Sequence, residues 1–242
     1  MAAISNAQTE HAKRIWELCP EIAHRVEEEY AALAADDKYI HHHDFGHAKR
    51  VGEVAYQVAK NEWGDEHIAK LAGIAGIVHN ADRIIQAQKD IGRRDVSRED
   101  VAALVKKWIA NDLQETDVVT ILDAVLGHDG KNADEDSLVK IALQDGDRVV
   151  NLDVDLLPRS RQYYNDLPVV DYEHLLDDPK ATYRKPRSVL KDIHYALDWV
   201  EPASGVCVRT KLGIEMARKR AEVIRFFFSA LKEQLREEGF EV

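Results

Sequence analysis

An apolar stretch without charge covers residues 71–78 and ends on two polar side chains, His79 and Asn80. A helix that is hydrophobic on every side has to be buried, so the other segments must pack around this one. Within it, Gly73 and Gly76 lie one turn apart, and each glycine costs about 1 kcal/mol relative to alanine inside a helix. Such a pair indicates the close approach of a second helix. Taken alone, His79 is most simply a buried histidine bonded to a carbonyl oxygen.

Helical periodicity dominates the rest of the chain, and sustained alternation of apolar and polar residues is scarce. In residues 44–63, a capping aspartate, Asp44, precedes the apolar face and Gly64 follows it. Ser97 opens a later helix with a capping box. The sequence therefore predicts an all-α fold. The expected helices cover about residues 7–33 with a break at Pro20, 44–63, 65–78, 81–91, 97–110, 116–126, 136–152, 188–200 and 207–238.

The 242 residues contain no Gly-, Ser- or Pro-rich linker and no internal repeat, so we expect one helical domain over residues 1–242. Its motif-bearing core covers about residues 44–152. Periodicity is lost over residues 153–186, where four prolines occur, and we expect an irregular cover with short helices over one end of the bundle. Two C-terminal helices follow within residues 187–238.

Charge and cysteine content limit the classes of function. The formal net charge is -11 and no segment forms a basic stripe, so binding of nucleic acid is not expected, whereas a small phosphorylated substrate needs only a local positive cluster. Cys19 and Cys207 do not form a disulfide framework, which favours a reducing cytoplasm. We expect no signal peptide and no membrane span, which would need about 20 apolar residues. The oligomeric state is left open, with a homodimer as one alternative.

Three separate helices each offer a metal-type ligand on an inward face. His47 lies in the first turn of one helix, His79 ends the apolar helix, and Asp145 or Asp147 lies on the apolar face of a third. A mixture of imidazole and oxygen donors suits a divalent ion of intermediate hardness. Such an ion lowers the pKa of bound water toward neutrality and so produces a nucleophile for phosphoester hydrolysis.

The order of these residues resembles the signature of the HD-domain metal-dependent phosphohydrolases. Residues 44–51 are similar to the helix of the first ligand, residues 71–83 to the apolar helix that ends in His-Asp, and residues 144–149 to the segment of the last aspartate. The resemblance extends over about residues 44–220. It implies an HD-type helical bundle and a divalent metal ion, with Mn, Mg, Ni, Zn and Fe not distinguished. The implied ligands are His47, His79, Asn80 and Asp147, with Asp145 as the alternative to Asp147.

Asn80 departs from this pattern, because the family has an aspartate at that position. A neutral amide oxygen is a weaker donor to a hard ion than a carboxylate. Three explanations are open: a deliberate substitution that silences the enzyme, a natural degenerate site, or a natural site with altered metal preference. The resemblance implies a phosphohydrolase acting on a small phosphorylated metabolite or a nucleotide. The alternatives are a catalytically impaired or non-catalytic nucleotide- or phosphate-binding protein, and a purely structural helical protein.

Four further residues are candidates for catalysis, namely Asp82, Arg83, His128 and Lys131. Arg83 follows the His79-Asn80 pair and can contact a substrate phosphate with two nitrogen atoms, or it can pair with Asp82 at the surface. His128 and Lys131 follow a helix that the resemblance places near the metal. His128 can contact a phosphate or a second metal ion, or it can simply interact with the C-terminal end of that helix.

Overall fold

The computed structural model describes residues 13–36, 38, 40, 43–92 and 95–241. Within them the chain is helical and contains no β-strand, only an isolated bridge between Thr182 and Lys185, so the all-α prediction is confirmed. The α-helices are α1 (Ile15–Leu18), α2 (Pro20–Ala35), α3 (Phe45–Trp63), α4 (Glu66–Val78), α5 (Ala81–Lys89), α6 (Arg98–Ile109), α7 (Glu115–Gly127), α8 (Leu138–Val150), α9 (Leu156–Tyr163), α10 (Val189–Tyr195) and α11 (Lys211–Glu237). Two 3-10 helices, η2 (Ala196–Val200) and η3 (Pro202–Ser204), separate α10 from α11.

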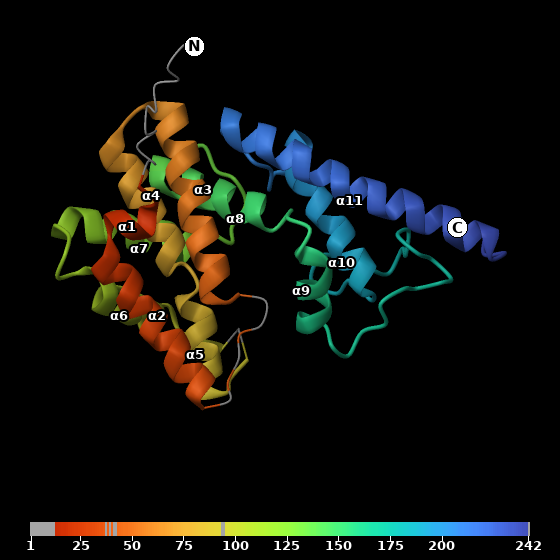
Figure 1. Cartoon of the computed structure of the whole chain (residues 1–242), viewed down its shortest axis with the longest axis horizontal. Helices are drawn as coiled ribbons and strands as arrows, with labels where there is room; N and C mark the ends of the chain where they lie inside the picture. Colours follow the sequence, from red (N-terminus) through yellow and green to blue (C-terminus); the bar gives the residue numbers. More distant parts are fainter. Residues whose placement is uncertain (1–12, 37, 39, 41–42, 93–94, 242) are drawn as a thin grey trace, which may run out of the picture.

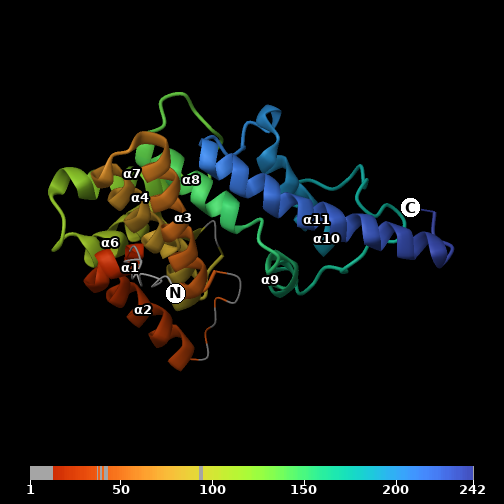
Figure 2. The ribbon, with the colours of Figure 1, turned by 45° about the horizontal axis from the view of Figure 1, so that its top comes forward.

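Helix α4 lies at the centre of the molecule. Every residue from Leu71 to Val78 is buried, as expected for a helix that is apolar all round. Helices α3, α7 and α8 pack directly against it. The ribbons in Figures 1 and 2 show α1 to α8 gathered around α4 in one lobe. The apolar stretch is thus the element around which the bundle is built.

Glycines let α3 meet both α4 and α8 at backbone distance. A methyl group added at Gly76 of α4 would lie 2.5 Å from Cα of Gly52 in α3. A methyl group added at Gly146 of α8 would lie 2.9 Å from the carbonyl oxygen of Val51 in α3. Both distances are shorter than a real Cβ contact, so neither position accepts a side chain without movement of a helix. The close approach predicted from Gly73 and Gly76 therefore occurs.

Local capping signals place the helix ends near their predicted positions. The Asp44 side chain accepts from the backbone N–H of His47, and Gly64 ends α3 with φ at +68°. Ser97 caps α6 by accepting from the N–H of Asp100, and Ser137 caps α8 in the same way. The expected start of the first helix, near residue 7, falls outside the described residues, within which α1 begins at Ile15; Pro20 separates α1 from α2 as predicted.

Helices α9, α10 and α11 extend from one side of the lobe formed by α1 to α8 (Figures 1 and 2). Helix α11 contacts α3 and α8, whereas its C-terminal half projects away from them. The residues expected to form an irregular cover contain α9, followed by turns over residues 164–188 that run beside α10 and α11. Within the described residues, no helix is both long enough and apolar enough to cross a membrane.

Candidate metal centre

His47 is held in the first turn of α3 and faces the interior. Its backbone N–H donates to Asp44 at 2.7 Å, which fixes the start of the helix, and the side chain is only 2% exposed. The Nδ1 atom lies 3.3 Å from Nη1 of Arg159, and Nε2 is buried without a hydrogen bond. His47 therefore presents Nε2 to the centre of the bundle.

His79 follows the last residue of α4 and is 1% exposed. Its Nδ1 atom lies 2.6 Å from the carbonyl oxygen of Gly76, and because a carbonyl can only accept, Nδ1 carries the proton. The lone pair is then on Nε2, which is buried and makes no hydrogen bond. The expected bond to a carbonyl is present. It also fixes the ring in the tautomer and orientation typical of metal-binding histidines.

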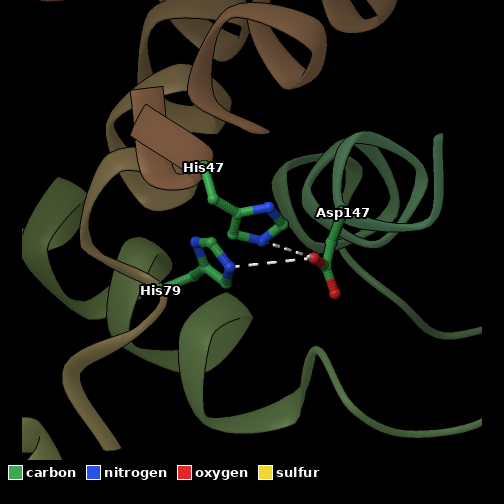
Figure 3. Close-up of side chains that lie close together, drawn as sticks. All are labelled: His47, His79 and Asp147. Atoms are coloured by element: carbon green, nitrogen blue, oxygen red, sulfur yellow. Dashed lines mark ion pairs between the residues drawn. The ribbon is translucent and has the colours of Figure 1, made fainter. Parts of the chain in front are cut away.

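Asp147 of α8 lies opposite both histidines (Figure 3). Its Oδ1 atom is 3.5 Å from Nε2 of His47 and 3.7 Å from Nε2 of His79. One potential ligand atom from each residue lies within 4.8 Å of the other two. Bonds of about 2 Å to a shared ion place neighbouring ligand atoms roughly 3 to 3.5 Å apart. The three side chains therefore form a cluster that can hold a metal ion after small movements.

Burial and charge set the protonation states that a cation needs. Burial lowers the pKa of His79 to about 3, and burial likewise lowers the pKa of His47, although Asp147 opposes both shifts. For Asp147, burial alone would raise the pKa, but the interactions with His47, His79 and His128 hold it well below its usual range. Near neutral pH, the cluster thus consists of two neutral imidazoles and one carboxylate.

Asn80 is buried next to His79 at the start of α5. Its Nδ2 atom makes no hydrogen bond, although buried amide groups normally do. Burial raises the pKa of the Tyr30 hydroxyl, and the Asn80 side chain acts in the opposite direction, so the two groups are neighbours. Asn80 thus follows a cluster residue directly in the chain, and its side chain lies near the Tyr30 hydroxyl of α2.

Asp145, the alternative ligand, has another role. Both of its carboxylate oxygens accept from the backbone N–H of Arg209 at 3.0 Å, and Oδ2 also accepts from the N–H of Thr210 at 2.7 Å. The side chain is fully buried, and burial raises its pKa while these bonds lower it. Asp145 thus anchors the segment that leads into α11, and Asp147 is the aspartate that faces the histidines.

The four candidate catalytic residues lie at different distances from the cluster. His128 stacks edge-on against His79, with ring centroids 5.4 Å apart, while its Nδ1 donates to the carbonyl of Val125 at the end of α7. Together with Asp82 and His79, it lines a cavity beside the cluster. Arg83 pairs with Asp82 at 3.8 Å, but it is buried rather than on the surface. Lys131 is exposed in the loop between α7 and α8.

Two residues near the cluster were not predicted. Asn151 follows Asp147 by four residues and donates to its Oδ1 at 2.8 Å. Arg159 of α9 contacts both His47 and Asn151, at 3.3 and 3.2 Å. The i, i+4 spacing on α8 is a signal that could have indicated Asn151. Arg159 lies where periodicity is lost, so the sequence offers no comparable signal.

A second His/Asp cluster occurs in the irregular segment, formed by Asp171, His174 and Asp178. Asp171 accepts from two backbone N–H groups, and Asp178 accepts from Arg187 at 2.7 Å and from the N–H of Lys180. These carboxylates hold the turns together, so the cluster has a structural explanation.

Comparison with family models, with curated proteins and with solved structures gives no match. The geometry and chemistry of the cluster are thus the basis for its function.

Proposed function

We propose that the protein is a metal-dependent phosphohydrolase that acts on a small phosphorylated metabolite or a nucleotide. The observation that carries this proposal is the convergence of His47, His79 and Asp147 from three helices. The two Nε2 atoms are buried and lack hydrogen bonds, an arrangement that costs free energy unless a ligand occupies the space between them. A divalent cation meets that requirement with the imidazole and carboxylate donors present.

The residues around the cluster support phosphoester hydrolysis. A bound divalent ion supplies Lewis acidity and lowers the pKa of bound water. Asp147 and the two imidazoles would hold the ion, and Asn80 would add a neutral amide oxygen. His128 lies against His79 at the cavity wall, where it can contact a phosphate oxygen. Arg83 and Asp82 lie within the first turn of α5. Lys131 would contact a substrate only from the exposed loop between α7 and α8.

The order of His47, His79 and Asp147 along the chain adds support, since it resembles the HD-domain phosphohydrolases. We also propose that the bundle is of the HD type and that the protein is located in the reducing cytoplasm. The free thiols of Cys19 and Cys207 are consistent with that location. Asn80 is the departure from that family. It favours the second candidate function, in which the same pocket binds a phosphorylated ligand without turnover, because one missing negative charge weakens metal binding.

The test begins with elemental analysis of protein purified without chelators or a metal-affinity step. We expect a near-stoichiometric divalent metal in the wild type and its loss in Asp147→Asn. Asp123→Asn, an exposed carboxylate on α7, is the matched control and should keep the metal. Phosphate release from a panel of phosphorylated metabolites then separates the two functions. Metal without phosphate release supports the binding protein, and equal metal content in all three proteins contradicts both candidates.

A further inference from the structure

A cavity of about 180 Å³ opens beside the cluster of His47, His79 and Asp147, between the start of α6 and the end of α7. His79 belongs both to the cluster and to the cavity wall, and His128 lines the cavity as well. A phosphate that reaches the cluster from this side would therefore leave the rest of its molecule in the cavity. Apart from His79, the residues of the cavity wall are not among the candidate metal ligands, so the shape and chemistry of the cavity bear on the substrate.

The wall of the cavity has an apolar side and a polar side. Val101, Val125 and Leu126 supply the apolar side. The polar side includes Asp82 and Asp129, whose carboxylates can accept hydrogen bonds from hydroxyl groups. A molecule that carries both carbon and hydroxyl groups satisfies the two sides.

Arg98 adds one positive charge at the rim. Its Nη1 donates to the carbonyl oxygen of Leu126 at 3.2 Å, so the guanidinium bridges α6 and α7 across the cavity. Because guanidinium has five N–H donors, this bond leaves others that can contact an oxygen of the ligand. Arg98 therefore offers donors to an oxygen atom of the organic part of the ligand.

The size of the cavity limits the organic part of the ligand. Pockets for drug-sized ligands enclose roughly 300 to 1,000 Å³. A volume of about 180 Å³ is below that range, so the cavity encloses only a small organic group. We infer that the substrate is a phosphomonoester with a small, hydroxyl-bearing organic group, smaller than a nucleotide, which lies between α6 and α7. This inference rests on the proposed function for the position of the phosphate.

Smaller side chains in the cavity wall test whether the size of the cavity limits the size of the ligand. Leu126→Ala and Val101→Ala together enlarge the cavity, and Leu113→Ala, a partly buried leucine elsewhere in the lobe, is the control. The probes are glycerol phosphate, ribose 5-phosphate and adenosine monophosphate, assayed with Mn²⁺. We expect kcat/KM of the wild type to be at least tenfold higher for the two small esters. The double variant should reduce this ratio about fivefold or more by raising the value for the nucleotide.

Calorimetric binding of the same three probes makes the result independent of turnover. If no ester is hydrolysed but the small esters bind more tightly than the nucleotide, and the double variant reduces that preference, the cavity assignment holds and the proposed hydrolysis fails. If the wild type prefers the nucleotide, binds none of the probes, or keeps its preference in the double variant, the assignment is overturned. A loss of preference in Leu113→Ala also overturns it, because the effect would then reflect general loosening of the fold.

Discussion

Asp145 and Asp147 lie two residues apart on α8, and their carboxylates serve opposite sides of the helix. A spacing of two residues turns a helix by roughly 200°, so neighbours of this kind face away from each other. Asp147 lies 3.5 Å from His47, whereas Asp145 accepts the backbone N–H groups of Arg209 and Thr210. One aspartate thus belongs to the candidate metal centre and the other holds α11 in place.

Substitutions at the two aspartates should differ in how added metal changes the free energy of unfolding. Asp145→Ala leaves two backbone donors unpaired, and each buried unpaired donor costs about 1 to 3 kcal/mol, so the free energy of unfolding should fall by at least about 2 kcal/mol. Asp147→Asn keeps the shape of the side chain but removes a carboxylate that the histidines stabilise, so it should also lower that free energy, by about 1 to 3 kcal/mol without metal. Added Mn²⁺ should stabilise the wild type and not Asp147→Asn. Urea unfolding with and without Mn²⁺ measures both effects, and metal stabilisation of Asp147→Asn would contradict its assignment as ligand.

Asn80→Asp should tighten metal binding. The two side chains have nearly the same shape, so the substitution adds a negative charge next to His79 with little change in packing. Changes even in the residues around metal ligands alter affinity about ten- to a hundredfold, and we expect a gain within this range. Phosphate release should rise in parallel. Titration with Mn²⁺, Mg²⁺, Ni²⁺ and Zn²⁺ measures the affinity, and unchanged affinity together with unchanged phosphate release would favour the non-catalytic binding protein.

Arg159→Gln should also raise metal affinity. Arginine can only donate, so its contact with Nδ1 of His47 requires a lone pair on that atom and a proton on Nε2. Coordination through Nε2 requires the opposite tautomer, so Arg159 competes with the ion. Removing this competitor and its charge should increase affinity roughly three- to tenfold. Arg161→Gln, in the same helix but bonded to the carbonyl of Tyr164, is the control and should have no effect. Weaker metal binding in Arg159→Gln would show that Arg159 supports the ligand set.

Gly76→Ala should destabilise the fold far more than Gly127→Ala. A methyl group at Gly76 meets the backbone of Gly52 at 2.5 Å, so α3 and α4 would have to separate, with an expected loss of about 3 kcal/mol or more. At Gly127, the nearest atoms belong to the flexible end of Lys140, and alanine should be neutral or stabilise the helix by up to about 1 kcal/mol. Thermal unfolding compares the two variants, and similar melting temperatures would contradict the backbone contact.

Asp136 should contribute stability that is lost in acid. Its side chain is 1% exposed and pairs with Lys140 at 2.6 Å and Arg209 at 2.9 Å. Burial would raise its pKa, but these partners and the N–H of Ala133 hold the pKa below the usual value of 3.8. A lowered folded-state pKa stabilises the fold above pH 3.8 and ceases to do so as the pH falls through the folded value. Asp136→Asn should therefore destabilise at pH 7 by about 1 to 3 kcal/mol and progressively less below pH 3.8. A constant difference at all pH values would contradict this.

The sequence predicted the helices of the lobe because their signals are local. Asp44, Gly64, Ser97 and Pro20 act within a turn of their own position, and the structure places helix ends beside each of them. The convergence of His47, His79 and Asp147 was predictable for a related reason, since each lies on the inward face of a periodic helix. Burial directs all three faces toward the same interior.

The rest could not be read from the sequence, since it depends on contacts between distant segments. Arg159 reaches His47 across more than a hundred residues, and no pattern in α9 marks it. Leu175 and Arg187 adopt positive φ angles of 46° and 67° without being glycine, so the usual turn signals are missing from the irregular segment. The different roles of Asp145 and Asp147 likewise depend on a distant residue, because Asp145 accepts the backbone N–H of Arg209, which lies 64 residues further along the chain.

The backbone contacts between α3, α4 and α8 bear on the radius of the ion that the candidate centre would accept. Gly52 lies five residues after His47, Gly76 three residues before His79, and Gly146 directly before Asp147. Backbone contacts of this kind do not lengthen without loss of packing, so the three candidate ligands would resist spreading around a larger ion. Calcium needs oxygen ligands at about 2.3 to 2.6 Å and six to eight of them, whereas Zn²⁺ and Mg²⁺ bind at about 2.0 to 2.2 Å. Three glycines without a ligand side chain would thus favour a small ion at the candidate centre.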